Sequence, residues 1–478
     1  MRRGIVGRAV LLLAVGLAAC VEPAREPEFD NLEQQAQASR STPTGALRWA
    51  HQITGEAPVI DEFPPEKSGR LARDGEDHVL VLYNFTGTLD LGDRQVRAPG
   101  GPGSDAIVLA RYDQRGRLEW VKLLGTGPGV EVGGAGGLQV AVDSHRNILL
   151  HVGASGADLG DGQLSSGEFL VKLDCHGRLL WKRSLSLSGD NNLTVFKLLT
   201  DRQDRIALAG RLQGTVDFGH GPVSSKPYPA GGFNPSAILA LFSPAGEIQW
   251  AYVHSQYAGE GTGATVDSQG HFILCGDAYV GGSTSAFALR LSPDGALLWD
   301  RYLQGPSFSM AWDVATHGNR VVLTGTFEGR FTFRRRIVSS DMSRPLRQDA
   351  FLLAYTRDGE ERWARAFGFS GSYVAMDQQD GVVAVGTYED GDDLGLGRLP
   401  SKGENSSNLY VAKYDRVDGR PLWIRGFPSG LAEPFAVAVT KDGRSVVLGS
   451  FRSGSFIVGS EEWPQKSPND LFLLGLER

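Results

Sequence analysis

The sequence predicts an all-β protein, a seven-bladed β-propeller of four-stranded antiparallel blades that is closed by pairing of an N-terminal strand with C-terminal strands. Three observations predict this fold. One tryptophan phrase recurs seven times, two tight hairpins accompany each phrase, and the two ends of the chain carry complementary pieces of one repeat. A repeat of this length with four strands is typical of a propeller blade.

The recurring phrase places a tryptophan on the last strand of each repeat. Seven of the nine tryptophans occur in it, at spacings of 49 to 71 residues. The phrases are GALRW at Trp49, GRLEW at Trp120, GRLLW at Trp181, GEIQW at Trp250, GALLW at Trp299, GEERW at Trp363 and GRPLW at Trp423. Because one tryptophan can bury about 150–250 Å², we interpret all seven as structural packing positions.

Two hairpins make up each repeat, and we name their strands A to D. Segments such as FLLAYTRDG form strand C and run into a tight turn before the tryptophan strand D. Segments such as DVATHGNRVVLTG form strands A and B. Strand B ends in glycine in six repeats, at Gly153, Gly210, Gly276, Gly325, Gly386 and Gly449. Glycine there suits positive φ or close backbone approach.

The faces of the strands and the ends of the chain complete the prediction. Segments such as FLLAY and VVAVG are apolar on both faces, which is typical of sheets covered on both sides. The first repeat begins with a lone D strand, LRWAHQI, and the chain finishes on a lone C strand at Asp470–Glu477. Pairing of these two segments would remove both sheet edges, and it gives seven blades without a remainder.

The N-terminus predicts export and a lipid anchor. Residues 1–19 have the basic start and short apolar core of a signal peptide. The segment that ends in Cys20 is LAAC, which resembles the lipobox of bacterial lipoproteins. The resemblance implies a lipid on Cys20 and, because Val21 follows it, favours the outer membrane. The alternative is an ordinary signal peptide with a cysteine near its cleavage site. Residues 20–44 are polar and are expected to form the anchor and a disordered tether.

Charge and cysteine content limit the partners and the cross-links. The chain has 48 basic and 55 acidic residues and a net charge of −7, which disfavours a nucleic-acid partner. Cys175 and Cys275 fall in a turn and in a strand of different repeats. We therefore predict no disulfide and expect the core alone to hold residues 45–478 together.

The connection between strands B and C carries a family resemblance. It is GTVDFGHGPVSS in the third repeat, and related phrases occur in the others except the fourth. Together with the hairpins and the tryptophan phrase, it resembles the SBBP-type bacterial β-propeller repeat over roughly residues 45–478. The resemblance implies an exported, often lipid-anchored propeller and transfers no catalytic residue.

Long B–C and D–A connections alternate with tight turns, so we expect them on one rim, where any binding site should lie. The Gly-rich stretch 258–263 is expected to be one such D–A crossing. Weak binding candidates on this rim are Trp312, Trp463 and the run Arg334, Arg335 and Arg336. Local packing of the aromatic rings and solvation of the charges are the simpler interpretations.

Searches for catalytic motifs find no G-x-S-x-G, no H-E-x-x-H and no cysteine pair at zinc spacing. We predict a monomeric, non-enzymatic binding or scaffolding propeller without a cofactor, which uses the long-loop face toward a protein or glycan partner. The alternative is a propeller hydrolase, lyase or quinone-dependent oxidoreductase with its site at the channel mouth. Carboxylates or a cofactor at the axis would favour the enzyme.

Overall fold

The structure is a computed structural model, and it describes residues 44–57, 70–99, 104–126, 138–154, 167–185, 192–227, 232–341, 348–378, 381–404 and 406–478. Within these ranges the chain folds into antiparallel β-sheets and turns, and no helix is present. The same ranges therefore contain no helix long and apolar enough to cross a membrane. The predicted signal peptide, Cys20 and nearly all of the tether lie outside the described residues.

Five separate sheets have four antiparallel strands each. The first contains β7 (Gln139–Val142), β8 (Ile148–Ala154), β9 (Gly167–Leu173) and β10 (Leu179–Ser184). The second contains β11 (Asn192–Thr200), β12 (Ile206–Gln213), β15 (Ser236–Phe242) and β16 (Ile248–His254). The third contains β17 (Gly259–Val266), β18 (Phe272–Val280), β19 (Ser283–Leu291) and β20 (Leu297–Tyr302). The fourth contains β21 (Phe308–His317), β22 (Arg320–Glu328), β25 (Asp349–Tyr355) and β26 (Glu361–Phe367). The fifth contains β27 (Ser370–Met376), β28 (Gly381–Tyr388), β29 (Asn408–Asp415) and β30 (Pro421–Phe427).

The remaining long strands form one larger sheet that joins the two ends of the chain. Its strands are β31 (Ser429–Val439), β32 (Ser445–Val458), β34 (Asp470–Leu476), β1 (Leu47–Ala57), β2 (Arg70–Arg73), β3 (Val79–Asp90), β5 (Asp105–Tyr112) and β6 (Leu118–Thr126), with β4 (Gln95–Arg97) and β33 (Glu461–Pro464) at its edges. β1 pairs with β34 so that Trp49 is opposite Gly475. The end of β1 also pairs with β3.

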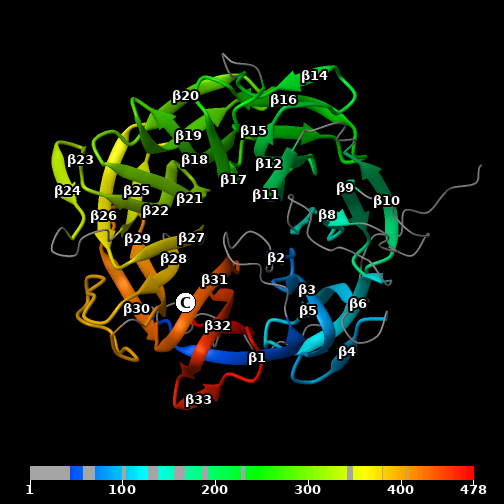
Figure 1. Cartoon of the computed structure of the whole chain (residues 1–478), viewed down its shortest axis with the longest axis vertical. Helices are drawn as coiled ribbons and strands as arrows, with labels where there is room; N and C mark the ends of the chain where they lie inside the picture. Colours follow the sequence, from blue (N-terminus) through cyan, green and yellow to red (C-terminus); the bar gives the residue numbers. More distant parts are fainter. Residues whose placement is uncertain are drawn as a thin grey trace, which may run out of the picture.

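The sheets stand around a common centre, and the strands nearest to it are β2, β11, β17, β21, β27 and β31 (Figure 1). Hydrophobic clusters fill the spaces between neighbouring sheets. One cluster, for example, joins Ile273 and Cys275 of β18 to Leu323 of β22 and Leu353 of β25. This stacking explains why the middle strands are apolar on both faces.

The repeated tryptophans and glycines interlock neighbouring sheets. In every repeat the C–D turn glycine has positive φ, and a Cβ on it would contact the tryptophan of the preceding repeat around the ring, at 2.4–3.1 Å in six pairs and at 3.8 Å for Trp120. The pairs are Trp49 with Gly116, Trp120 with Gly177, Trp181 with Gly246, Trp250 with Gly295, Trp299 with Gly359, Trp363 with Gly419, and Trp423 with Gly45. A Cβ atom on Gly116 would lie 2.4 Å from the Trp49 ring. The packing role predicted for the tryptophans thus has a defined partner in each case.

Buried ion pairs brace the tight A–B turns in several sheets. The turn aspartates accept hydrogen bonds from backbone N–H groups and also meet a basic side chain on strand C. The pairs are Asp74–Arg111, Asp143–Lys172, Asp267–Arg290 and Asp377–Lys413, at 2.5–2.9 Å. Burial opposes ionisation of Asp74, but hydrogen bonds from His78 and the Glu76 backbone, with the charge of His78, lower its pKa to about 2.

The B–C phrases form short hairpins at the outside of the sheets rather than open loops. The hairpins are β13 (Thr215–Asp217) with β14 (Pro222–Ser224), β23 (Arg330–Phe333) with β24 (Arg336–Ser339), and β32 with β33. β14 contacts β16, and β24 contacts β26, the outermost strands of their sheets. These hairpins are therefore peripheral (Figure 1).

The predictions for the Gly-rich stretch and for the cysteines are wrong. The Gly-rich stretch 258–263 is largely part of strand β17 and not a crossing loop. Its glycines are needed inside a strand because a Cβ on Gly259 would lie 2.1 Å from the Asp277 carbonyl oxygen. Cys275 is buried and free, so it does not pair with Cys175. Cys175 is nevertheless disulfide-bonded, which the sequence did not predict.

Candidate binding site in the central channel

The innermost strands share a β-bulge at the same level of the ring. The register shifts lie between Val195 and Lys197, Gly261 and Gly263, Ala311 and Asp313, Gly371 and Tyr373, and Pro434 and Ala436. The bulge residues are Phe196, Thr262, Trp312, Ser372 and Phe435, and we call them the bulge ring. A bulge changes the direction of a side chain, and all five bulge residues line one central cavity.

The repeated glycine of strand B permits each bulge. Gly210, Gly276, Gly325, Gly386 and Gly449 pair with the residue that precedes the bulge. None of them has a positive φ. A Cβ on any of them would lie between 1.8 and 2.5 Å from a carbonyl oxygen of the bulged strand. Of the two roles predicted from the sequence, close backbone approach is therefore the correct one.

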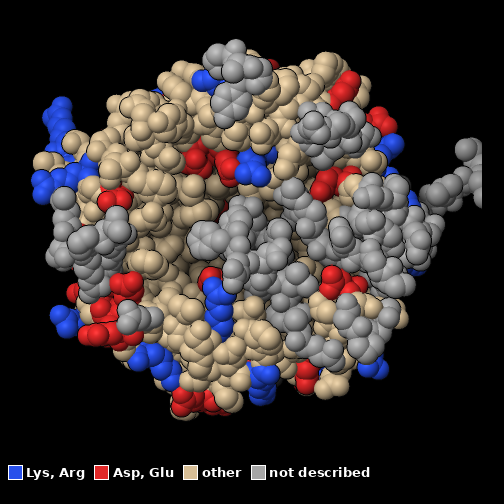
Figure 2. All heavy atoms as spheres, in the orientation of Figure 1, with Lys and Arg blue, Asp and Glu red and all other residues tan. Residues whose placement is uncertain are grey.

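The cavity, which we call the upper chamber, has a volume of about 270 Å³. Residues of every innermost strand line it, including Arg70 on β2, Gln139 on β7 and Glu433 on β31. Figure 2 shows the face of the molecule that is also seen in Figure 1. A hollow lies near its centre, with acidic and basic side chains beside it. Aromatic rings with a few polar groups among them are typical of a small-molecule site.

An ion pair crosses the channel at the base of the upper chamber. Lys197 Nζ of β11 lies 3.2 Å from Asp313 Oδ1 of β21, although another sheet lies between them in the ring. The equivalent position of that sheet is Gly263, where a Cβ would lie 2.7 Å from the Asp313 Cα. The other carboxylate oxygen accepts a hydrogen bond from the Val374 backbone N–H at 3.2 Å. Asp313 thus connects three sheets.

A second cavity of about 290 Å³ lies beyond this ion pair. Its lining includes apolar side chains such as Leu199, Val266 and Met376 together with the polar Thr265 and Thr316. Lys197 is the residue that lines both cavities. The Lys197–Asp313 ion pair therefore separates two chambers of the central channel.

A group of charged residues joins the innermost strand β17 to the neighbouring strands β12 and β18. Arg211 Nη1 is 2.6 Å from Glu260 Oε1. Asp277 is directly opposite Glu260 in the antiparallel register. Burial, followed by the negative charge of Glu260, raises the pKa of Asp277 to about 7, and Arg211 opposes this shift. Burial and Glu260 thus bring the pKa of Asp277 into the neutral range.

The residues predicted for binding do not come together. Trp312 is a bulge residue and lines the upper chamber. Trp463 lies in the outer hairpin of β33, packs on Phe456 with 6.2 Å between ring centroids, and donates a hydrogen bond to Glu461.

The three arginines lie in another outer hairpin. Arg334 and Arg335 form the turn between β23 and β24, both with positive φ, and Arg336 begins β24. All three are exposed. The Arg334 guanidinium donates a hydrogen bond to the Arg362 carbonyl. The arginines therefore belong to the periphery and not to the channel mouth, because the B–C phrase folds against strand D.

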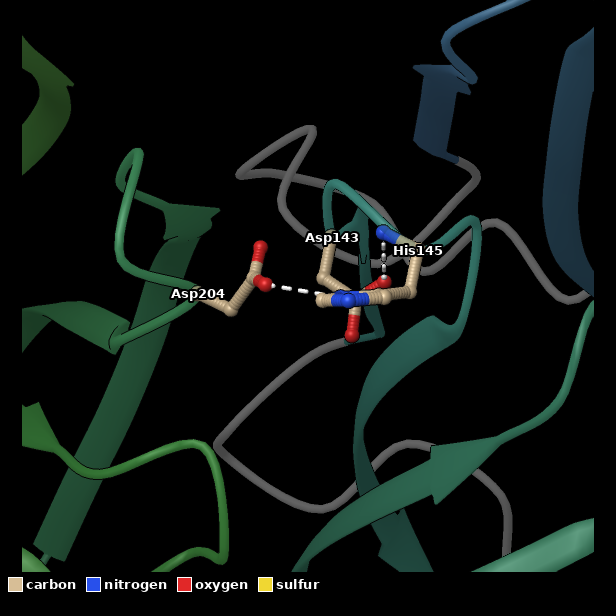
Figure 3. A group of neighbouring side chains, drawn as sticks. All are labelled: Asp143, His145 and Asp204. Atoms are coloured by element: carbon tan, nitrogen blue, oxygen red, sulfur yellow. Dashed lines mark hydrogen bonds and ion pairs between the residues drawn. The ribbon is translucent and has the colours of Figure 1, made fainter. Parts of the chain in front are cut away.

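Asp143, His145 and Asp204 form a group with the spacing of metal ligands (Figure 3). Their oxygen atoms already have partners. Asp143 accepts the His145 backbone N–H and pairs with Lys172. Asp204 accepts the Ser144 hydroxyl and lies 2.9 Å from His145 Nδ1. We therefore interpret this group as a set of hydrogen bonds between two neighbouring A–B turns.

Sequence reasoning missed Phe196, Phe435, Lys197 and Asp313. One signal could have found the bulge ring, because each of its members lies 13 or 14 residues before the glycine of strand B. No local signal identifies the Lys197–Asp313 pair, because the two residues are separated by 116 positions.

The radial sheets, the innermost first strands and the central channel define a β-propeller. No family model and no curated protein matches the chain. Solved structures that are similar in fold include the three that follow. A quinohemoprotein alcohol dehydrogenase from Pseudomonas putida has 10% identity, a TM-score of 0.42, and 90% of this chain and 76% of that chain covered. The β-propeller domain of the trilobed protease from Pyrococcus furiosus has 10% identity, a TM-score of 0.41, and 86% and 94% covered. BamB from Moraxella catarrhalis has 12% identity, a TM-score of 0.36, and 82% and 98% covered.

Proposed function

We propose that this propeller is a non-enzymatic binding module that receives its ligand, or an anchoring group of a protein or glycan partner, in the upper chamber. The bulge ring carries this proposal. One fixed backbone device in five successive sheets directs side chains of different chemistry, Phe196, Thr262, Trp312, Ser372 and Phe435, to one cavity. Three of these side chains, Thr262, Trp312 and Ser372, are only half-buried, and they differ in size and polarity although the backbone around them is the same.

The acidic groups of the upper chamber support binding rather than catalysis. Asp313 uses both carboxylate oxygens in structural contacts. Glu433 lies 3.5 Å from Arg452. A carboxylate engaged through both oxygens, as Asp313 is, is a poor general acid or base, because catalysis requires a free proton-transfer position.

One observation favours the enzyme alternative. Asp277 and Glu260 are adjacent carboxyl groups whose environments differ, and a carboxyl with a pKa of about 7 is suited to proton transfer. If the protein is an enzyme, these two residues are the candidates for its acid and base. An activity lost in both Asp277→Asn and Glu260→Gln, with the fold intact, would establish this alternative.

We also propose that the propeller has seven blades and a closed ring. Pairing of β1 with β34 supports closure. The tryptophan–glycine contacts support it independently, because they pass from Trp423 to Gly45 and from Trp49 to Gly116. An experimental structure with β1 apart from β34, or with another number of sheets, would overturn this proposal.

The proposed setting is the outer membrane, with a monomeric SBBP-type propeller anchored through a lipid on Cys20. The LAAC segment and Val21 support this proposal. A Cys20→Ser variant should move from the membrane to the soluble fraction of lysed cells. Intact-mass analysis that showed a free Cys20 thiol, or a disulfide between Cys20 and Cys175, would contradict the anchor.

The binding proposal is tested by photo-crosslinking in the cells that make the protein. A photoreactive amino acid replaces Trp312 in the upper chamber, and a control places it at Ile337, which is 74% exposed on the outer hairpin. We expect a discrete adduct from position 312 and none from position 337. Equal labelling at both positions, or no adduct at position 312, would refute the proposal.

A further inference from the structure

We propose that the upper chamber recognises small carboxylates with an aromatic or apolar body, and that Lys197 anchors the carboxylate. This inference rests on the proposed function and names the ligand class of the same site. It follows from a cation at the base of a cavity whose upper part is lined by aromatic rings.

Lys197 is a cation with unused hydrogen-bonding capacity. Its ammonium group carries three donors, and among the described residues it has one polar partner, Asp313 Oδ1 at 3.2 Å. The Lys197 side chain is 35% exposed, whereas the Asp313 side chain is 4% exposed. The exposed part of Lys197 borders the two chambers, so its remaining donors are accessible from the channel.

Asp313 is a weak competitor for a ligand at this position. Its second oxygen is fixed by the Val374 N–H, and its backbone is held beside Gly263. Asp313 therefore holds Lys197 at the channel axis but satisfies only one of its donors. An incoming carboxylate can bind Lys197 next to Asp313 without displacing it, and hydrogen bonds between ions are stronger than those between neutral groups.

The ring above Lys197 selects the rest of the ligand. Phe196, Trp312 and Phe435 come from three different sheets, and the half-buried Trp312 offers apolar surface to the chamber, whereas Phe435 is buried in the core beside it. Thr262 and Ser372 lie between them in the order of the sheets. The Thr262 hydroxyl already donates to the Ala311 carbonyl at 2.6 Å. The volume of about 270 Å³ is slightly below the usual range of about 300–1,000 Å³ for ligand pockets. It suits one ring and a short chain.

Titration calorimetry on the purified full chain tests this inference with defined probes. The probes are benzoate and 3-phenylpropanoate, and their uncharged amides are the matched controls. We expect each carboxylate to bind about 10-fold or more tightly than its amide, which is the usual value of one charge-assisted hydrogen bond. Lys197→Met should abolish this preference, and Trp312→Ala should weaken the acid and the amide alike.

A second variant separates recognition from folding. Asp313→Asn keeps an acceptor for the Val374 N–H and releases Lys197 from its counter-charge. We expect it to bind the carboxylates several-fold more tightly than the wild type, which a merely damaged site would not do.

Three outcomes would overturn the inference: absence of carboxylate binding by the wild type, equal affinity for acid and amide, or a preference that survives Lys197→Met. If these occur while position 312 still gives a specific crosslink, the ligand class is wrong and the binding function stands. If the crosslink is also absent, both proposals are wrong.

Discussion

Gly325→Ala tests whether the strand B glycines create the bulge ring. A Cβ at position 325 would lie 2.1 Å from the Met310 carbonyl oxygen and 2.5 Å from the Phe351 ring. Ordinary contact begins at about 3.4 Å, so the two strands would have to separate by about 1.3 Å. Gly325 has no positive φ, so the substitution itself gains about 0.4–1 kcal/mol from the unfolded state. Overpacking costs about 1–3 kcal/mol or more. We expect a cost near the upper end of this range, because the clash is with the Met310 backbone, which cannot move aside as a side chain could. We expect a net loss of about 2 kcal/mol.

Urea unfolding followed by circular dichroism measures this loss. Gly75→Ala is the matched control, because Gly75 also lacks a positive φ and a Cβ there would meet nothing within 4 Å. It should be neutral or slightly stabilising. Because Gly325 pairs with Ala311, next to Trp312, the Gly325 variant should also lose the crosslink from position 312. A Gly325 variant as stable as the Gly75 variant, with crosslinking unchanged, would refute the role assigned to these glycines.

Three further predictions concern the frame and its charges. Trp299→Ala should lower the free energy of unfolding by about 3–5 kcal/mol, and an unchanged melting temperature would contradict the interlock. Lys413→Met should cost about 3–5 kcal/mol by leaving Asp377 charged and buried, and adding Asp377→Asn should recover most of it in a double-mutant cycle. Burial and Glu260 raise the pKa of Asp277 to about 7. The folded state therefore binds this proton more tightly than the unfolded state does. The resulting contribution to the free energy of unfolding is complete below about pH 4 and is lost as the pH rises through 7. Asp277→Asn should therefore be more stable than the wild type at pH 8, by at most about 4 kcal/mol for three units, and equally stable at pH 4; the same difference at both values would contradict the shift.

The sequence was sufficient for the strands and for their order within each sheet, because both depend on local signals. The Asp/Gly turns, the apolar runs and the tryptophan phrase recur often enough to define the hairpins without any distant contact. Trp312, a rim candidate from the sequence, lies on the innermost strand β21 and lines the upper chamber. The prediction worked wherever a residue's role was decided within its own repeat.

The predictions were wrong where a residue's role is decided by a neighbouring sheet. Gly259 to Gly263 have the composition of a loop, yet they form a strand because backbone atoms approach them closely, Asp277 at Gly259 and Asp313 at Gly263. The outer hairpins were expected at the binding rim, but they pack against strand D, which separates Arg334 from the channel. Neither arrangement has a signature in a single repeat.

The contacts that hold the sheets together are separate from the residues that line the upper chamber. The tryptophan–glycine contacts and the turn ion pairs hold the sheets together at their outer strands and tight turns, away from the bulge ring. The bulge itself depends on the strand B glycine and not on the side chain that it directs inward. Thr262 and Trp312 occupy equivalent positions on the same backbone device, although they differ greatly in size and polarity. If the upper chamber binds a ligand as proposed, its specificity would reside in half-buried bulge residues such as Thr262 and Trp312 and not in the tryptophan–glycine contacts that join the sheets.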